Sequence, residues 1–555
     1  MEKIWLKNYP ADVPADISMA SGDTLVSMLE HSFREFADRP AFACMGKSLS
    51  YGELERESAA FGAWLQNGAG LKPGTRVAIM LPNILQYPVA LFGALRAGMV
   101  VVNVNPLYTA RELKHQLVDS GAEAIVILAN FAHVLQKVIG GTALKQVVVT
   151  EFGDLLGWPK STLVNFALKR VKKMVPGYRL PGHRRLNKVL AEGAQSRLSA
   201  AQLDGESLAF LQYTGGTTGP SKGAMLSHRS VYANVLQMSA LTDPVTEPGR
   251  EVVITALPLY HIYALVVNCM CFVRVGGLNV LIPNPRDVPG FVAELKKWDF
   301  TAFFGVNTLY NALVHDPGFS EVGFGALKMA GGGGMAVQRA VAEKWHSLTG
   351  HVLLEGYGLT ECSPVVAMSQ IGRTEVYTAD VGLPLPSTEI SIRDEAGNEL
   401  PVGERGELCV RGPQLMQGYW QQEQASQQSF HQDGFLRTGD IAVINEGGYL
   451  QIVDRAKDMI LVSGFNVYPC EVEDVATQHP GVLEAACIGV EDEKSGEAVK
   501  LFIVRQPGSQ LQADELIAHC RANLTGYKAP RQIEFRDELP KTNVGKILRR
   551  ALRDG

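Results

Sequence analysis

Residues 208–223 read LAFLQYTGGTTGPSKG, and residues 214–223 of this stretch are a run of glycines and hydroxyl residues closed by a lysine and a glycine. The run follows LAFLQY, which has the composition of a buried strand. Backbone N–H groups and hydroxyls of such a loop can surround phosphate oxygens, and Lys222 adds a positive charge. A Walker A loop has glycine, lysine and Ser/Thr in that order, whereas here Ser221 precedes the lysine and Gly223 follows it. The stretch therefore predicts a phosphate-binding loop of another type, with an ordinary flexible loop as the alternative.

Short apolar runs with the length of buried strands lie on both sides of this loop, and segments with helical periodicity separate them. This alternation predicts βαβ units and mostly parallel sheets, in which ligands bind beyond the carboxyl ends of the strands. The fold class is therefore expected to be α/β. The runs are VVVNVN (100–105), EAIVILAN (123–130), QVVVT (146–150), EVVITALP (251–258) and TAFFGV (301–306).

The domain organisation follows from length and from a change in texture along the chain. At 555 residues the chain is longer than one hydrophobic core usually supports. From about Gly403 the strands become shorter and are punctuated by glycines, as in GELCVRG and GYLQIVD, and the last hundred residues resemble a compact α+β module. We expect a large N-terminal domain with a β-rich subdomain (1–453), a hinge (454–458) and a small, mobile C-terminal domain (459–555). The polar stretch 181–206 is expected to be an irregular surface excursion.

Composition excludes several classes of protein. Hydrophobic residues make up 46% of the chain and charged residues 20%, which is typical of a folded globular protein and not of a disordered one. The formal net charge of −5 argues against a broad electrostatic attraction to nucleic acid or to anionic lipid headgroups. We therefore expect no nucleic-acid partner, and any anionic ligand must be held locally.

Cellular location is addressed by three features. The eight cysteines include no CxxC pair, and the start MEKIWLKNYPADVPAD lacks the apolar stretch of a signal peptide. Residues 255–273 carry no charged side chain, but Pro258, His261 and Asn268 interrupt them, so a buried helix is favoured over a membrane span. We expect reduced thiols in a cytoplasmic protein.

Further motifs follow the glycine-rich loop in a fixed order, and together they resemble the superfamily of adenylate-forming enzymes, which includes acyl-CoA synthetases, luciferases and peptide-synthetase adenylation domains. The resemblance spans roughly the whole chain. Its departures are the order Gly-Pro-Ser-Lys in the loop, where Gly-X-Pro-Lys is usual, and Phe435 in place of a common Trp. The motifs are ALPLYHIYAL (256–265), four glycines (331–334), EGYGLTE (355–361), GELCVRGPQLMQGYW (406–420), RTGD (437–440), DRAKDMILVSGFNVYPCEVE (454–473) and PKTNVGKILRR (540–550).

The resemblance implies a nucleotide site. In it, Tyr357 stacks on adenine, and Asp440 accepts the ribose hydroxyls with Arg455 as its companion. Carboxylate oxygens suit this role because each can accept hydrogen bonds. The four glycines would let the backbone approach the nucleotide, although a tight turn would use them equally well. The other residues expected to bind ATP or AMP are Thr214, Gly215, Gly216, Thr217, Thr218, Gly219, Gly332, Gly333, Gly334, Glu355, Gly356 and Gly358.

Catalytic residues are also implied by the resemblance. Thr360 and Lys222 would contact the phosphates, and Glu361 would hold the Mg²⁺ that bridges them, with Thr214 as a second metal ligand. Lys546 would reach the substrate carboxylate and the α-phosphate, where a positive charge offsets developing negative charge. The neighbouring Arg549, Arg550 and Arg553 are expected to be a solvated basic helix terminus.

Acyl, CoA and hinge residues complete the expected site. His261 would lie beside the acyl carboxylate, with a buried structural histidine as the alternative. Gly305 and Val306, in the apolar segment 303–313, are candidates for the acyl pocket, although such a segment could equally be core. The pantetheine tunnel is assigned to Ser463, Gly464 and Phe465, and the hinge to Asp454 and Lys457.

The function implied is that of an AMP-forming ligase that activates fatty acids, long-chain ones by resemblance, with ATP and then transfers the acyl group to CoA. Its cofactor would be Mg²⁺ and its partners ATP, fatty acid and CoA. We expect a homo-oligomer that makes transient contact with the cytoplasmic face of a membrane. The alternatives are an enzyme that loads a carrier protein and a non-catalytic fatty-acid or nucleotide sensor.

Overall fold

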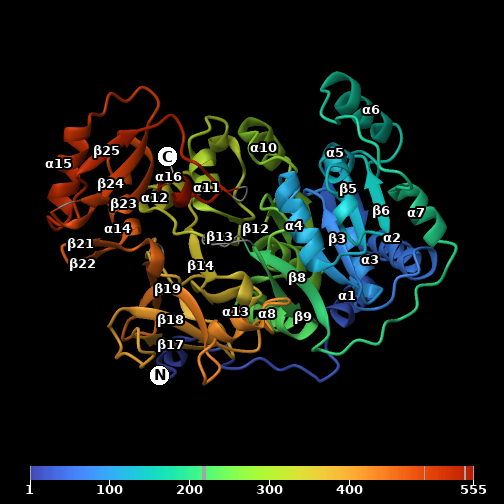
Figure 1. Cartoon of the computed structure of the whole chain (residues 1–555), viewed down its shortest axis with the longest axis horizontal. Helices are drawn as coiled ribbons and strands as arrows, with labels where there is room; N and C mark the ends of the chain where they lie inside the picture. Colours follow the sequence, from blue (N-terminus) through green and yellow to red (C-terminus); the bar gives the residue numbers. More distant parts are fainter. Residues whose placement is uncertain (1, 215–220, 375, 493, 543–544, 554–555) are drawn as a thin grey trace.

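The computed structural model describes residues 2–214, 221–374, 376–492, 494–542 and 545–553, and these form four sheets. Figure 1 shows two sheets with helices around them, a β-rich part below them and a separate C-terminal unit to one side. The expected α/β class is therefore confirmed.

The first sheet contains the strand that precedes the glycine-rich loop. Its pairs are parallel except for the antiparallel pair β8–β9, in which Thr214 lies opposite Lys222. Strands of this sheet are buried on both faces because helices cover them, which explains their continuous apolar sequences. The strand order is β7 (Arg184–Arg185), β6 (Gln146–Thr150), β5 (Ala124–Leu128), β3 (Arg76–Met80), β4 (Val100–Asn103), β8 (Leu208–Thr214) and β9 (Lys222–Ser227).

The second sheet has nine strands among the described residues, and its centre is parallel. It contains the predicted strands at 251–258 and 301–306. The four glycines 331–334 are not mainly a turn, because Gly331 to Gly333 pair within a parallel strand. The order is β16 (Leu383–Pro384), β15 (Val365–Met368), β14 (Leu354–Gly358), β13 (Met329–Gly333), β12 (Ala302–Gly305), β10 (Val252–Thr255), β11 (Leu278–Leu281), β1 (Pro40–Cys44) and β2 (Lys47–Ser50).

Two smaller sheets follow in the chain. The antiparallel sheet is β17 (Glu389–Arg393), β18 (Gly406–Arg411), β19 (Leu436–Ile444) and β20 (Leu450–Arg455), as expected for a β-rich part. The short helix η10 (Ala456–Asp458) links it to the C-terminal sheet. That sheet has the order β22 (Phe465–Val467), β21 (Ile460–Val462), β24 (Gly496–Arg505) and β23 (Val482–Asp492), with β25 (Gln532–Phe535) beside β24.

The helices pack on these sheets. Several begin with capping boxes, for example at Thr24, Ser50 and Thr109. In each, the side chain of the N-cap residue accepts the backbone N–H of the third helical residue, whose own side chain accepts the N-cap backbone N–H. The α-helices are α1 (Leu25–Glu35), α2 (Tyr51–Ala63), α3 (Gln86–Arg96), α4 (Ala110–Ser120), α5 (Ala132–Gln136), α6 (Lys160–Phe166), α7 (Leu186–Gly193), α8 (His228–Thr242), α9 (Cys271–Arg274), α10 (Val288–Leu295), α11 (Asn307–Val314), α12 (Arg339–Thr349), α13 (Glu423–Gln428), α14 (Pro469–Thr477), α15 (Ala513–Asn523) and α16 (Arg549–Arg553).

Two expectations about segments need correction. The stretch 181–206 is not irregular throughout, because it contains β7 and the amphipathic helix α7. This helix packs chiefly on α2 and on the π-helix η2 (Trp64–Gly68) and also contacts β6. The apolar stretch 255–273 is only partly helical. Its first residue is the last residue of β10, a loop follows, and the stretch then forms the π-helix η7 (Ala264–Met270) and most of α9. Every residue of η7 is buried, so it is a core helix. In the part of the chain that the structure describes, no helix is long and apolar enough to cross a membrane.

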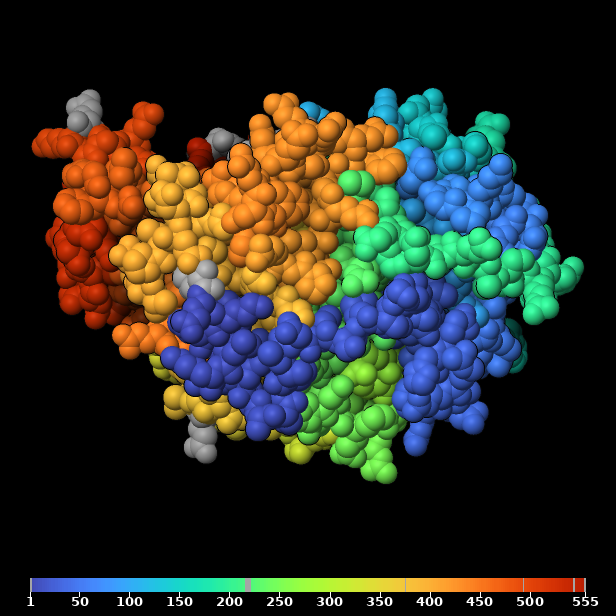
Figure 2. Space-filling model, turned by 90° about the horizontal axis from the view of Figure 1, so that it is seen from below, coloured from blue at the N-terminus to red at the C-terminus, as the bar shows by residue number. Residues whose placement is uncertain are grey.

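The N-terminal segment ties the β-rich part to the second sheet. Figure 2 shows it in dark blue across one face of the molecule, against the orange and yellow segments. Trp5 is buried against Gly448, where a Cβ would lie 2.4 Å from the Trp5 Cα. The Tyr9 hydroxyl donates to the Pro384 carbonyl at 2.5 Å. This segment therefore fixes the position of the antiparallel sheet, which supplies one wall of the cavity described next.

Candidate active site

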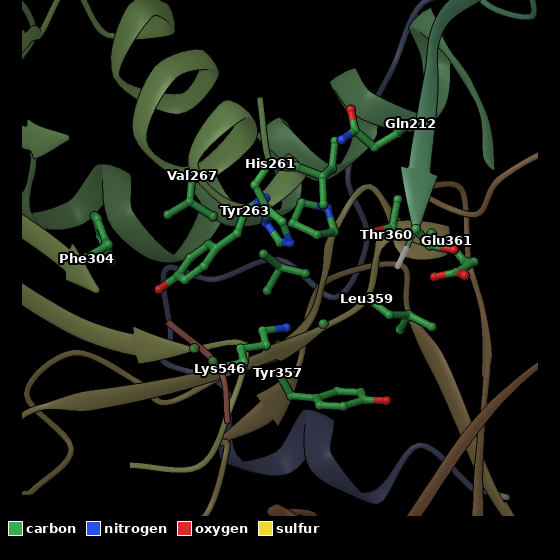
Figure 3. A pocket seen from close by; sticks show the side chains of 18 of the residues that line it. Gln212, His261, Tyr263, Val267, Phe304, Tyr357, Leu359, Thr360, Glu361 and Lys546 are labelled. Atoms are coloured by element: carbon green, nitrogen blue, oxygen red, sulfur yellow. The ribbon is translucent and has the colours of Figure 1, made fainter. Parts of the chain in front are cut away.

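One large cavity, of about 970 Å³, lies at the carboxyl ends of β8, β13 and β14. This is the edge at which parallel sheets hold ligands. Figure 3 shows side chains from distant parts of the chain converging on it. The predicted residues that line it are Thr214, Lys222, His261, Gly332, Gly333, Gly334, Glu355, Gly356, Tyr357, Gly358, Thr360, Glu361, Arg455, Lys457 and Lys546.

Some predicted residues are not part of this lining. Gly305 and Val306 are absent from it, because Gly305 faces the Tyr310 ring and Val306 packs beside Gly334 and Gly545. Ser463, Gly464 and Phe465 are also absent. They are exposed, and Phe465 stacks on Tyr527 with ring centroids 4.8 Å apart. Gly215, Gly216, Thr217, Thr218 and Gly219 lie outside the described residues.

A polar cluster lies on one side of the cavity, where Tyr357 and the half-exposed Arg455 line it and both contact the buried Asp440. The Tyr357 hydroxyl donates to Asp440 Oδ2 at 2.5 Å, and Arg455 Nε lies 2.8 Å from Asp440 Oδ1. Asp440 and Arg455 face each other as cross-strand partners in β19 and β20. Burial raises the pKa of Asp440, and the Arg455 charge opposes that shift. The sheet register therefore provides a carboxylate with a permanent cation beside it.

The Glu361 side chain lies on the opposite wall, beside a residue that sequence reasoning did not single out. The Tyr419 hydroxyl donates to Glu361 Oε1 at 2.7 Å. Lys222 Nζ lies 5.0 Å from the centroid of the same tyrosine ring, within the range of a cation–π contact. Tyr419 therefore positions both a carboxylate and an amine. It lies near the end of the motif 406–420.

Lys546 enters the cavity from the C-terminal part of the chain. A Cβ on Gly334, which has φ +78°, would lie 2.9 Å from Lys546 Cε, so only glycine leaves room for this side chain. The Thr308 hydroxyl donates to the Gly545 carbonyl at 2.8 Å and fixes the preceding turn to α11. Burial and then the Arg455 charge lower the pKa of Lys546 to about 8, and Asp440 opposes them. The amine is therefore mostly protonated at neutral pH.

His261 faces this amine as a neutral side chain. Burial and then the Lys546 charge lower the pKa of His261 to about 3. The Tyr263 backbone N–H donates to His261 Nδ1 at 3.3 Å, so in the neutral ring the proton is on Nε2. In Figure 3, the Lys546 amine lies between Tyr357 and the pair His261 and Tyr263. The arrangement combines a half-buried cation with a neutral N–H donor.

The glycines of β13 and the carboxyl of Glu355 shape the floor of the cavity. A Cβ on Gly332 would lie 2.3 Å from Val337 Cγ2, and one on Gly333 would lie 3.1 Å from the Tyr263 ring. Glu355 Oε1 accepts the Val337 N–H at 2.5 Å, and burial raises its pKa to about 7. Glu355 therefore holds the segment that follows β13 in place.

The cavity has an apolar end, of which the sequence indicated only the segment 303–313, through Phe304. Its side chains come from α8, η7, β12 and β13, and they also line a small adjoining cavity of about 10 Å³. The periodic apolar helix within 255–273 was the available signal, but only the packing of α8 across η7 shows which side chains face a space. The residues shared by both cavities are Met238, Thr242, Val267, Phe304 and Met329.

Arg549 is not the solvated residue that the sequence suggested. Its side chain is 17% exposed, and its guanidinium lies 2.8 Å from Glu473, 3.3 Å from Asp454 and 3.5 Å from Asp458. Asp454 Oδ2 also accepts the Cys470 N–H at 2.8 Å. Arg549 therefore connects the linking segment to the C-terminal sheet and its helices.

All eight cysteines are free thiols, as expected, and Cys470 alone among them is not fully buried.

Comparison with known proteins gives two family matches along the chain. Residues 29–420 match the model of the AMP-binding enzyme family, and residues 471–546 match that of the AMP-binding enzyme C-terminal domain. This chain belongs to the AMP-binding enzymes. The first match covers more than half of the 555 residues and contains most of the cavity lining.

Relatives of this AMP-binding enzyme are similar over their full length. A long-chain-fatty-acid–CoA ligase of Escherichia coli O6:H1 is 56% identical over 100% of this chain and 98% of its own. The ligase of the same name from Bacillus subtilis is 36% identical over 99% of this chain and 98% of its own. Among solved structures, ATP-bound MatB from Rhodopseudomonas palustris has a TM-score of 0.79 at 27% identity, covering 95% of this chain and 98% of its own. An anthranilate CoA ligase with anthranoyl-AMP has a TM-score of 0.85 at 24% identity, covering 97% and 98%, and shows the shared fold.

The electrostatics of the cavity predict how the Lys546 amine titrates. In the ligand-free protein its pKa should be about 8. Arg455→Gln should raise this pKa because a neighbouring positive charge is lost, whereas Asp440→Asn should lower it because a negative charge is lost. The pKa can be measured by NMR of ¹³C-methylated lysines, with the signal assigned by its absence in Lys546→Arg. A pKa near that of exposed lysines, unchanged in both variants, would contradict the buried environment.

Proposed function

We propose that this chain is an AMP-forming long-chain fatty acid:CoA ligase. The supporting observation is that a nucleotide-type polar cluster, a half-buried lysine and an apolar extension meet in one cavity. The full-length relatives named long-chain-fatty-acid–CoA ligase support the same conclusion. The substrates are ATP, a fatty acid and CoA.

The polar cluster binds the nucleotide in this proposal. The Tyr357 ring stacks on adenine, and Asp440 accepts the two ribose hydroxyls while Arg455 neutralises its charge. Thr214 and Lys222, which lie opposite each other in β8 and β9 and line the cavity, contact the phosphates, and Thr360 contacts the same oxygens. The Gly332 to Gly334 backbone forms the floor beneath the nucleotide, because these residues carry no side chains of their own and line the cavity.

Mg²⁺ is the cofactor that the donor set fits. Glu361 and Thr214 both line the cavity and offer hard oxygen ligands, which suit this ion. When bound, Mg²⁺ would neutralise phosphate charge. Tyr419 holds the Glu361 carboxylate through its hydroxyl, so the side chain is oriented before any ligand arrives.

In the first reaction step, a fatty-acid carboxylate oxygen attacks the α-phosphorus of ATP. The new P–O bond replaces the bond to the β-phosphate, and pyrophosphate leaves with both electrons of that bond. The protonated Lys546 amine and the Nε2–H of His261 stabilise the negative charge on the reacting oxygens. Lys222 stabilises the phosphates from the other wall. Catalysis depends on positioning and charge, with no covalent enzyme intermediate.

In the second step, the CoA sulfur attacks the acyl carbonyl carbon, its proton is lost to solvent, and AMP leaves as the carbon–oxygen bond breaks. We assign residues 1–453 to the N-terminal domain, 454–458 to the hinge and 459–555 to the mobile domain. Rotation at Asp454 and Lys457 would withdraw Lys546 and bring Ser463, Gly464 and Phe465 to the thiol entrance. Their exposed position and the cavity position of Lys546 fit an adenylate-forming arrangement.

The apolar end of the cavity accommodates the acyl chain in this proposal. Its walls, such as Met238, Val267 and Phe304, carry no charge. In Figure 3, Val267 and Phe304 lie across the cavity from Glu361. An apolar chain gains roughly 0.8 kcal/mol for each buried CH₂, so the length of this space selects for chain length. The protein acts in the cytoplasm as a homo-oligomer, and it binds no nucleic acid.

The function is tested by supplying ATP, CoA and fatty acids of increasing length and measuring AMP and acyl-CoA. Lys546→Ala should lower adenylate formation by about 10²–10³ because it removes one preorganised charge. Thioester formation from supplied acyl-adenylate should remain largely intact, because Lys546 acts only in the first step. Equal losses in both half-reactions would contradict the role of Lys546. Transfer to a holo carrier protein in preference to CoA would contradict the ligase assignment.

The hinge proposal is tested by Lys457→Pro, which fixes φ near −65° in the linking segment. Acyl-AMP should accumulate on the enzyme with a burst of pyrophosphate, while acyl-CoA formation falls by orders of magnitude. Lys457→Ala is the matched control, since it removes the same amine from the cavity and leaves the backbone free. Parental acyl-CoA output from folded Lys457→Pro protein would show that 454–458 is only a linker.

The acyl-pocket proposal is tested by Val267→Phe, which adds volume where the two cavities meet. We expect kcat/KM for palmitate to fall at least tenfold while that for hexanoate changes less than threefold, because only the longer chain reaches this point. Thermal unfolding of the variant controls for overpacking. An equal loss for both acids would place the acyl chain elsewhere.

A further inference from the structure

The segment around α6 combines exposed apolar and basic side chains to a degree found nowhere else among the described residues. Twelve large apolar side chains of the described chain are exposed, and five of them lie within residues 158–174. They are Trp158 (88% exposed), Leu163 (64%), Phe166 (60%), Val171 (70%) and Met174 (53%). Clustered exposure of this kind marks an interaction surface.

The charge of the same segment is strongly positive. Between Asp154 and Glu192 there is no acidic residue, whereas the formal net charge of the chain is −5. Lys169 lies 3.7 Å from Glu151, but among the described residues no carboxylate lies within ion-pair distance of Arg170, Lys172 or Lys173. The basic residues of this interval are Lys160, Lys169, Arg170, Lys172, Lys173, Arg179, Arg184, Arg185 and Lys188.

The helix has an inner and an outer face. α6 continues into the π-helix η5 (Ala167–Val171). On the inner face, Asn165 accepts the Gly153 N–H at 2.7 Å and donates to Asp154 at 3.0 Å, and Val164 packs against the core. Leu163 and Phe166, three positions apart, therefore point outward. Figure 1 shows α6 projecting from the edge of the molecule beyond α5.

We propose that residues 158–174, which we name the α6 patch, dock the protein on an anionic lipid bilayer. Exposed aromatic and aliphatic side chains beside unpaired lysines and arginines are the features by which a helix lies in the headgroup region. The charge complementarity selects an anionic surface, since the rest of the chain is net acidic. The inference extends the proposed function, because a bilayer is where long-chain fatty acids partition.

The test is co-sedimentation of the full chain with vesicles of phosphatidylglycerol and phosphatidylcholine and with vesicles of phosphatidylcholine alone. The parental protein should prefer the anionic vesicles, and salt should weaken the preference. The double change Leu163→Ser with Phe166→Ser, and the triple change Arg170→Glu, Lys172→Glu and Lys173→Glu, should each weaken binding at least about tenfold, since one basic residue near the surface contributes about fivefold.

Matched controls carry the same changes at exposed positions elsewhere. Leu107→Ser with Val376→Ser matches the apolar change, and Lys72→Glu with Lys344→Glu and Arg521→Glu matches the change in net charge. These controls should bind vesicles like the parental protein. Trp158→Phe should remove most of the fluorescence quenching that brominated lipids cause, because this indole is the most exposed apolar side chain described.

The outcomes separate this inference from the proposed function. Vesicle binding is measured without substrates, so it stands or fails even if no fatty acid is activated. With an active enzyme, the patch variants should keep the parental rate on water-soluble octanoate and lose rate on vesicle-held oleate. Equal binding by patch and control variants, or no preference for anionic vesicles, would overturn the inference. So would a change in oligomeric state by sedimentation velocity with unchanged vesicle binding, which would identify the patch as a contact between copies.

Discussion

The placement of the half-buried Lys546 side chain in the cavity is the constraint on which the rest of the site depends. A charged amine loses hydration when it enters a cavity, so it is stable there only with compensating partners. Asp440 provides a negative charge that stabilises the protonated amine, and Arg455 partly neutralises that charge. Gly334 provides the space for the lysine side chain. These residues come from the antiparallel sheet, its last strand and the second sheet. With Lys546 itself on the C-terminal unit, the site therefore requires the antiparallel sheet, the second sheet and that unit to be in place together.

Contacts between distant segments fix the parts of the fold that surround Lys546. The N-terminal segment fixes the antiparallel sheet through Trp5 and Tyr9, and the Thr308 hydroxyl fixes the turn before Lys546. In contrast, the contact of the C-terminal unit with the cavity is made by few residues, and the Arg549 ion pairs concentrate on the linking segment. In the proposed two-step mechanism, a lysine carried by a separate unit is withdrawn without disturbing the cluster of Tyr357, Asp440 and Arg455.

Polar and apolar chemistry are separated along one cavity. The carboxylates and cations lie at the carboxyl ends of the strands, whereas the helices α8 and η7 contribute only uncharged walls at the other end. A substrate with a charged head and an apolar tail matches this separation. The α6 patch lies apart from the cavity lining, so binding to a bilayer and catalysis use different side chains.

The sequence alone determined the α/β class, the positions of several buried strands and part of the cavity lining, because strand periodicity and short motifs such as 355–361 are local. It did not determine which side chains meet across the cavity. The partnership of Tyr419 with Glu361, the ion pairs of Arg549 and the apolar space at Val267 arise between residues far apart in the chain. The glycines 331–334 could serve a turn or a strand, and the choice depended on pairing with β12 and β14. Likewise, the net charge of −5 for the whole chain gave no sign of the basic α6 patch. Which apolar side chains are exposed there depends on packing. Only the tertiary structure decides these features, since it alone brings distant residues together and leaves others in solvent.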